Sequence, residues 1–494
     1  MIHIIGGGLA GSEAAWQAAS EGVPVTLYEM RPGRPTAVHK SDRLAELVCS
    51  NSFRGDKLDN AVGLLKAEMR RLGSLVMRAA EASRVPAGAA LAVDRARFAE
   101  TVTRALGEHP LVTVVRQEVV AIPSSTERDP VIVATGPLTS DALSADIARL
   151  VGREHLSFYD AISPIVSAES IDQGRVFRAS RWNRNVGPRP DATCEGTGRA
   201  IGCAIDDGQG DYLNCPLTRD EYARFYDALT HAESATVHDF DQEKFFEGCL
   251  PIEVMAHRGV DTLRFGPMKP VGLVEPRTGR PPYAVVQLRQ DSLAGDHYSL
   301  VGFQTQLKWA EQARVLRLIP GLERAEFVRF GMVHRNTYVN GPHVLADTWQ
   351  VRRLPSVFFA GQMSGVEGYV ESAASGLMAG LGAAALARGE PIATPPRTTA
   401  IGALAHYVSH ADPAHYDPSN ITFGIMEALP SPPRSKLERK LALSERALVD
   451  LAAWMSRHSS LARGASPTPE RESLRSSARS FAAGGGAPAA IGKS

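Results

Sequence analysis

Residues 1–30 read MIHIIGGGLAGSEAAWQAASEGVPVTLYEM, and this stretch decides the fold. An apolar run, Ile2–Ile5, leads into three consecutive glycines, an alanine-rich helical stretch, and a second apolar run that ends at Glu29. A strand, a glycine-rich turn, a helix and a second strand in this order form the unit that binds the diphosphate of a dinucleotide. The sequence therefore predicts a dinucleotide-binding domain at the N-terminus.

Each part of this turn has a physical task. Gly6 permits the tight turn, Gly8 lets the backbone approach a pyrophosphate, and Gly11 lets the helix lie against the strand. The helix N-terminus offers unpaired N–H groups to phosphate oxygens, and the acid after the second strand can accept a bond from a ribose hydroxyl. A purely structural glycine turn is the alternative. We predict cofactor contacts from Gly6, Gly7, Gly8, Leu9, Ala10, Gly11, Glu29 and Arg31.

Two later segments indicate FAD as the cofactor. The strand-like PVIVATG ends at Gly136, and SVFFAG at residues 356–361 runs into GQMSGVEGY and an Ala/Gly-rich helix over residues 370–388. FAD is long enough to cross the sheet and meet a second helix N-terminus, whereas a nicotinamide enzyme has no evident use for this segment. The predicted contacts are Gly136, Gly361, Gln362, Gly365, Glu367 and Gly368. Glu371 is a further acid that could set this turn or cap the helix.

The fold class expected is α/β. We expect a discontinuous, Rossmann-like FAD-binding domain of the glutathione-reductase type, built from residues 1–160 and 325–455. From residue 161 to residue 324 the pieces are short, rich in β-formers and interrupted by prolines, which predicts an inserted mixed α+β domain. Residues 456–494 are rich in Ser, Ala, Gly and Arg, and we expect them to be disordered because they offer little apolar surface to bury.

Composition excludes several classes of protein. The 494 residues carry 54 basic and 54 acidic side chains, so no overall field draws the chain to nucleic acid or membrane. Five cysteines without CxxC spacing argue against a disulfide framework or a zinc site, and we expect no metal. We expect no apolar run that approaches the length of a membrane span, and the N-terminus opens directly into a strand. We therefore expect a cytoplasmic protein with reduced thiols.

Longer motifs carry a family resemblance. They are CSNSFRGDKLDNAVGLLKAEM (49–69), DYLNCPLT (211–218), FEGCLPIE (246–253), DTLRFGPMKPVGL (261–273), VGFQTQLKW (301–309), GMVHRNTYVN (331–340) and FFAGQMSGVEGYVESAASGL (358–377). Together, over roughly residues 1–450, they resemble the folate- and FAD-dependent tRNA (uracil-5-)-methyltransferases. The chain is more distantly similar to the flavoprotein that modifies wobble uridines with a GTPase partner, whose helical C-terminal domain has no counterpart after residue 455.

The resemblance implies an activity. The methylene of 5,10-methylenetetrahydrofolate would pass to C5 of the T-loop uridine at position 54 of tRNA. Reduced flavin would give the hydride, and NAD(P)H would restore it. The implied partners are tRNA and folate, with no membrane and no obligate protein partner. The alternatives are an FAD-dependent oxidoreductase of a small metabolite, the wobble-uridine activity, and a flavin-containing protein that binds tRNA or a partner without turnover.

The resemblance also implies two functional cysteines. Uracil C5 is a poor nucleophile until a group adds to C6, and a thiolate suits that addition. The family motifs CSNSF and LNCP carry these thiols at Cys49 and Cys215. We expect Cys215 to react with uracil and Cys49 to lie by the flavin as partner thiol or acid/base, although which thiol attacks stays open. Cys194 and Cys203 match no functional motif, and we interpret Cys249 as structural; a small core hydrophobe is the alternative for any of them.

Folate needs a stacking surface and polar donors. The motif GMVHRNTYVN supplies a ring, a cation, an amide and an aromatic in His334, Arg335, Asn336 and Tyr338. We expect His334 to face the pterin or the flavin, with a structural histidine as the alternative.

Transfer RNA binding needs local basic surface. Residues 175–189 carry five arginines and no acid, with Trp182 among them. Arginine forks suit phosphates and an indole can stack on a base, so we expect Arg178 and Arg181 to contact tRNA. A solvated arginine-rich loop is the alternative. More than twenty residues separate Trp182 from Asp211, where the family pattern is short, and this leaves the loop geometry near Cys215 open.

Overall fold

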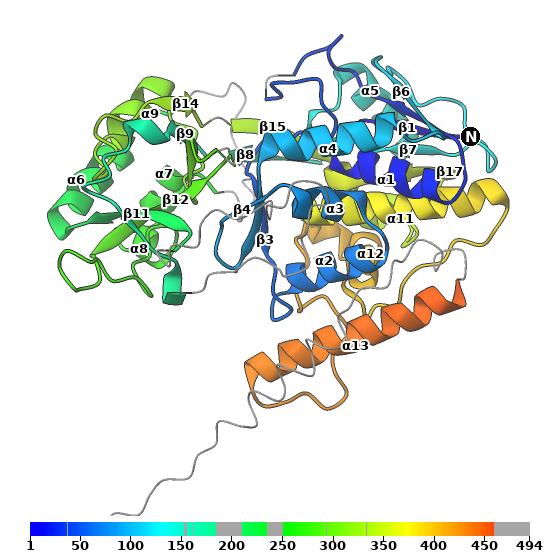
Figure 1. The fold of residues 1–494 in the computed structure, drawn as a ribbon. Coiled ribbons are helices and arrows are strands. Elements are labelled where there is room, and N and C mark those ends of the chain that lie inside the picture. Colours follow the sequence, from blue (N-terminus) through cyan, green and yellow to red (C-terminus); the bar gives the residue numbers. More distant parts are fainter. Residues whose placement is uncertain are drawn as a thin grey trace, which may run out of the picture.

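The computed structural model describes residues 1–36, 38–152, 156–161, 163–183, 210–234, 250–292, 294–331 and 333–458, with only the backbone at 156–161, 183, 333–337 and 415. Figure 1 shows the strands and helices between residues 163 and 331 gathered on one side and the remaining elements gathered on the other. Nearly all of the tail predicted to be disordered lies outside the described residues.

The first of two large sheets contains the N-terminal strand, β1. Its strand order is β16-β17-β7-β1-β2-β6, and all neighbouring strands are parallel except β16 and β17, which are antiparallel. This confirms the predicted α/β class with a parallel sheet. The strands are β1 (Ile2–Ile5), β2 (Val25–Tyr28), β6 (Val112–Val115), β7 (Val131–Val133), β16 (Gln350–Val351) and β17 (Leu354–Phe359).

Two helices rich in small residues pack closely against each other beside this sheet. They are α1 (Leu9–Ser20), which follows β1, and α11 (Tyr369–Arg388), which follows β17 and a short 3-10 turn, η5 (Gly361–Ser364). A Cβ at Gly376 would lie 2.1 Å from the Ala10 carbonyl oxygen, and one at Gly380 would lie 2.5 Å from the Ala14 oxygen. Because the two backbones touch, both N-termini are fixed at the carboxyl edge of the sheet.

Helix α11 also corrects one expectation. By length and composition alone it could cross a membrane, so the expectation that no apolar run approaches that length was wrong. However, 78% of its apolar window is buried inside the molecule. The apolar character of α11 is that of a core helix between a sheet and other helices.

The remaining elements on this side surround the sheet. The helices are α2 (Ala61–Arg71), α3 (Leu75–Ala82), α4 (Arg95–Gly107), α5 (Asp141–Val151), α10 (Gly341–Val344), α12 (Ala400–His410) and α13 (Lys436–Arg457). A small sheet holds β3 (Ser52–Gly55), β4 (Arg84–Val85) and β5 (Ala90–Val93), and the 3-10 turn η1 (Gly136–Leu138) follows β7. The sequence also predicts helices over residues 95–106 and 437–455, and the structure confirms them as α4 and α13.

The second large sheet is antiparallel throughout. Its order is β10-β11-β12-β13-β9-β14, from β9 (Ile165–Ser167), β10 (Phe177–Arg178), β11 (Tyr212–Leu217), β12 (Ala284–Gln290), β13 (His297–Leu300) and β14 (Phe327–Arg329). One face packs against α6 (Arg219–Thr230), α7 (Ile252–His257), α8 (Thr262–Phe265) and α9 (Trp309–Leu316). The opposite face carries polar side chains toward the first sheet, as described below.

A two-stranded ribbon joins the two sides. The chain enters the second sheet after β8 (Leu156–Ala161) and returns through β15 (Val333–Tyr338), and these two strands pair antiparallel. The hydrophobic residues form two large clusters, one within residues 2–147 and 339–455 and the other within residues 166–325. On this basis we propose the predicted domain boundaries near residues 160 and 325.

Candidate functional site

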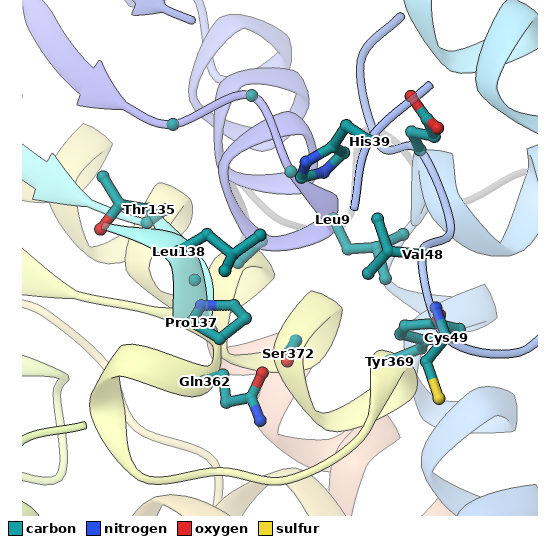
Figure 2. Close-up of a pocket in the computed structure, with 18 of the residues that line it drawn as sticks. Leu9, His39, Val48, Cys49, Thr135, Pro137, Leu138, Gln362, Tyr369 and Ser372 are labelled. Carbon is teal, nitrogen blue, oxygen red and sulfur yellow. The ribbon is translucent and has the colours of Figure 1, made fainter. Parts of the chain in front are cut away.

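A cavity of about 500 Å³ opens at the carboxyl edge of the first sheet and reaches the polar face of the second. Figure 2 shows Leu9, His39 and Val48 along one wall, Pro137 and Leu138 along the opposite wall, and Cys49 beside Tyr369. The second sheet contributes Arg289 and the end of β13 with the turn after it, Ser299–Gly302. Segments distant in sequence therefore form one elongated site.

Most of the predicted cofactor residues line this cavity. They are Gly6, Gly7, Gly8, Leu9, Ala10, Glu29, Arg31, Gly136, Gly361, Gln362, Glu367 and Gly368. Gly11 does not: a Cβ there would lie 1.8 Å from the Gly6 carbonyl oxygen, so it serves the contact of helix with strand. Gly365 also stands outside, at φ +88°, where a Cβ would meet the Tyr416 hydroxyl at 2.1 Å. Tyr416 donates to the Gly365 carbonyl and so braces the turn before α11.

Two helix N-termini at the cavity have no side-chain cap. Helix α1 begins after Gly8 and α11 begins after Gly368. In neither helix does a capping side chain accept a hydrogen bond from the N–H groups of the first turn. By contrast, Asn60, Ser74, Asp94, Thr218 and Thr399 cap α2, α3, α4, α6 and α12. A Cβ at Gly8 would meet nothing within 4 Å. Free N–H groups beside open space fit phosphate oxygens and other electron-rich ligand atoms.

Glu29 is a fixed, ionised acceptor at the end of β2. The Gly7 N–H donates to its Oε2 at 3.1 Å, and Arg31 donates from Nε to its Oε1 at 2.9 Å. Burial alone would raise the pKa of this carboxyl, but the bonds from Arg31 and Gly7 hold it below its ordinary value. Arg31 is buried against Glu29 and also reaches Glu46, so it orients the acid from within the wall.

The loop that carries Cys49 is held from three sides. The N–H groups of Cys49 and Ser50 donate to the Tyr369 hydroxyl at 2.7 and 3.1 Å. Arg95, at the start of α4, donates to the carbonyls of Leu47 and Cys49 at 2.8 and 3.3 Å. The half-buried Cys49 is therefore presented to the cavity by a backbone with little freedom to move.

The second sheet completes this support. Arg289 donates from Nε to Asn51 Oδ1 and from Nη2 to Ser50 Oγ, both at 2.8 Å. Asn51 is fully buried and donates its amide to the Gln290 carbonyl at 3.0 Å. The Cys49 loop is thus the point where the two sheets meet.

Charged residues beyond this loop hold the strand that follows it. Lys66 is fully buried in α2 and donates to the carbonyls of Phe53 and Arg54 at 3.1 and 3.2 Å. Its ammonium lies 3.3 Å from Asp56, which also pairs with Arg70 and Arg84. Burial lowers the pKa of Lys66 to about 8, against the attraction of Asp56.

Replacing Asp56 with Asn should destabilise the protein by about 3 kcal/mol at pH 7, because it leaves Lys66 buried without its carboxylate. Although burial opposes the charge, the three cations hold the Asp56 pKa well below its unfolded value. Its stabilisation is therefore present above pH 4 and declines as the pH falls through the acid range. Urea unfolding at pH 7 and pH 3 should show a smaller difference between wild type and variant at pH 3. The exposed Asp227→Asn is the control, and a pH-independent difference would refute this account.

Cys215 lies away from the cavity. It stands on β11, fully buried among core residues that include Tyr222 and Phe225, and burial raises the pKa of its thiol. Its neighbour Asn214 points to the opposite, polar face, where its Oδ1 accepts from Gln287 at 2.9 Å. Of the two predicted functional cysteines, the structure brings only Cys49 to the cavity. Cys194, Cys203 and Cys249 lie outside the described residues.

The predicted folate and RNA residues are dispersed. Tyr338 is buried beside Tyr416, with ring centroids 6.2 Å apart, and burial raises its pKa to about 12. His334, Arg335 and Asn336 belong to β15, but their side chains lie outside the described part of the chain.

The arginines expected to contact tRNA are engaged within the protein. Arg178 donates to the Tyr298 hydroxyl at 3.0 Å, and Arg181 donates to Gln287 Oε1 at 3.0 Å and to the Lys269 carbonyl. Trp182 next to them is half exposed. Neither arginine lines the cavity.

Several cavity residues escaped the sequence reasoning. His39 lines the wall near Leu9, and burial followed by the nearby Arg31 lowers its pKa to about 4, so its imidazole is neutral at pH 7. Arg54 also lines the cavity, where it reaches Asn420 and pairs with Glu371. Glu371, the acid that the sequence predicted for this turn, is itself fully buried and does not line the cavity. Tyr369 is the last residue of the motif GVEGY, so that motif could have identified it as a cavity residue, whereas no sequence pattern identifies Arg289.

Within the described ranges, no three His, Cys, Asp or Glu side chains converge to hold a metal ion.

Comparisons with known proteins give one consistent answer. The family model described as "GIDA: Glucose inhibited division protein A" matches residues 1–391. A Desulforudis audaxviator protein named methylenetetrahydrofolate–tRNA-(uracil-5-)-methyltransferase TrmFO is 57% identical over 92% of this chain and 98% of its own length. A Streptococcus pyogenes protein of the same name is 54% identical over 91% and 97%. The solved structure of Aquifex aeolicus GidA superposes with a TM-score of 0.68 at 18% identity, covering 97% of this chain and 76% of that one, which shows the shared fold.

Proposed function

This chain belongs to the glucose-inhibited division protein A family and to its methylenetetrahydrofolate–tRNA-(uracil-5-)-methyltransferases, and from this membership we propose that it methylates C5 of a tRNA uridine. The carbon donor is 5,10-methylenetetrahydrofolate. The observation that carries the proposal is identity above half over nearly the whole length of relatives with that name. We propose the T-loop uridine at position 54 as the target and NAD(P)H as the source of electrons, in a cytoplasmic enzyme.

The cofactor we propose is FAD. The uncapped N-terminus of α1 would take its diphosphate, Glu29 its ribose, and the turn before α11 its ring system. When bound, the flavin supplies the hydride that completes the methyl group. The protein groups that line the far end, Cys49, Ser50 and Tyr369, would face the ring and whatever substrate stacks against it.

Two thiols divide the chemistry on uracil in this proposal. Cys215 adds to C6 and makes C5 nucleophilic, and Cys49 acts as the acid/base thiol beside the flavin. Because Cys215 is buried, its reaction requires that RNA binding open the core around β11. The position of Cys49 on the cavity wall supports its part in the proposal.

For the substrates, we propose His334 and Asn336 as the folate-facing residues of β15 and Arg178 and Arg181 as tRNA contacts. The arginines would exchange neutral acceptors, a hydroxyl, an amide and carbonyls, for phosphate oxygens, which bind guanidinium more strongly. Tyr338, buried against Tyr416, would support β15 rather than meet the substrate itself.

The direct test is an assay with unmodified tRNA transcript, methylenetetrahydrofolate, NADPH and the FAD-loaded protein. We expect 5-methyluridine in the T loop, found by nuclease digestion and mass spectrometry, and none when folate is omitted. Flavin turnover that ignores RNA, with no methylated base, would instead favour an oxidoreductase of a small metabolite. A colourless protein that stays inactive with added FAD would contradict both readings.

A further inference from the structure

Three guanidinium groups lie near Cys49, and one of them, that of Arg289, lines the cavity. Arg95 comes from α4, Arg289 from β12 and Arg329 from β14, and each interacts electrostatically with Cys49. Arg329 also interacts with Tyr369 and His39, which line the cavity. The second sheet thus places two positive charges near Cys49, and helix α4 places a third there.

Acidic partners do not balance these charges. Among the described residues, Asp291 is the carboxylate that pairs with one of the three, at 3.0 Å from Arg95 Nε. Burial opposes the charge on Arg95, yet Asp291 holds the pKa of Arg95 above its ordinary value. Burial lowers the pKa of Arg289 and of Arg329, because neither forms an ion pair with a described carboxylate and the attraction of Asp291 does not offset their burial. One negative charge therefore faces three positive ones.

Arg289 and Arg329, which form no ion pair with a carboxylate in the described part of the chain, can also accept a ligand as a hydrogen-bond partner. Arg289 is 9% exposed, lines the cavity, and directs Nε and Nη2 to the neutral acceptors Asn51 and Ser50. The Nη2 of Arg329 is buried and has no hydrogen-bond partner. A buried guanidinium nitrogen that has neither a carboxylate nor a hydrogen-bond acceptor is costly, so it favours a place where a ligand supplies the missing acceptor.

We propose that Arg289 and Arg329 bind an oxyanion of a substrate, a phosphate or a carboxylate, beside Cys49. Guanidinium groups bind either oxyanion through paired N–H donors. The Ser50 hydroxyl on the same wall, which accepts from Arg289, offers a further donor. This site differs from the uncapped N-termini of α1 and α11, since its charges come from β12 and β14. In the proposed function, on which the identity of the ligand rests, the oxyanion is a tRNA phosphate or a glutamate carboxylate of folate.

The first test uses inorganic phosphate and does not depend on the proposed function. Thermal unfolding of the FAD-loaded protein is followed against phosphate, with chloride at equal ionic strength as the salt control. We expect phosphate to stabilise wild type, with an apparent affinity at least about tenfold weaker in Arg329→Gln. Arg324→Gln removes the same charge from an exposed position in the same segment and should behave as wild type. If Arg329→Gln does not fold, Arg329→Met replaces it, with the same loss expected.

The second test identifies the source of the oxyanion. Dissociation constants of unmodified tRNA and of tetrahydrofolate are measured for wild type, Arg329→Gln and Arg324→Gln. A tenfold loss for tRNA, with a salt dependence reduced by about one ion, identifies a phosphate. A tenfold loss for tetrahydrofolate alone identifies a carboxylate. Unchanged affinities for phosphate, tRNA and tetrahydrofolate would overturn the proposal. Failure of the methylation assay with an intact phosphate effect would overturn the proposed function and leave this site standing.

Discussion

Replacing Gly11 with alanine should unfold the N-terminal unit, whereas replacing Gly8 with alanine should leave the fold intact and remove the flavin. A Cβ at position 11 would lie 1.8 Å from the Gly6 carbonyl oxygen. The backbone fixes both atoms, so no change of rotamer can relieve the clash. We expect Gly11→Ala to cost at least about 3 kcal/mol, at the upper end for overpacking in a tight core. A Cβ at position 8 meets nothing within 4 Å, but it would occupy the approach to the uncapped N-terminus of α1.

Two measurements separate these effects. Urea unfolding of the apoprotein should place Gly8→Ala within about 0.5 kcal/mol of wild type, the range for substitutions that disturb no contact. Flavin absorbance after purification, and titration with FAD, should show at least tenfold weaker binding. Gly107→Ala, at the end of α4 with nothing within 4 Å of its Cβ, is the matched control for both. A Gly8→Ala protein that keeps its flavin would place the diphosphate elsewhere.

Replacing Cys215 with alanine should reduce tRNA methylation by at least about a thousandfold, as the loss of a covalent nucleophile does. Removal of one buried sulfur should leave the protein folded, at a cost of about 1–2 kcal/mol. The readout is 5-methyluridine, together with the adduct to RNA carrying 5-fluorouridine, whose C5–F bond holds the adduct at the covalent stage. We expect Cys49→Ala to lose methylation but still to form the adduct.

The burial of Cys215 also predicts how the two thiols react with an alkylating reagent. In the free protein, iodoacetamide should modify Cys49 readily and leave Cys215 unmodified, because Cys215 has no exposed surface and burial raises its pKa. With bound tRNA, protection of Cys215 should decrease. If Cys215→Ala still forms the adduct and Cys49→Ala does not, the attacking thiol is Cys49, which already lines the cavity.

The sequence alone was enough to predict the helices, strands and turns that depend on residues close together in the chain. The strand, turn and helix of residues 2–20 follow from a short apolar run, glycines at fixed offsets and small residues at helical spacing. The second glycine turn and α11 follow from the same signals near residues 358–388. For this reason most of the predicted dinucleotide contacts do line the cavity.

Only the tertiary structure decided which distant side chains meet. Tyr369 and the Cys49 backbone are 320 residues apart, and Arg289 and Asn51 are 238 residues apart, so no local pattern could pair them. The alternation of a strand puts Asn214 and Cys215 on opposite faces, but which face becomes the core depends on the helices that pack there. Packing of α6, α7 and α9 on one face of the second sheet buried the thiol and left the arginine-bearing face to meet the cavity.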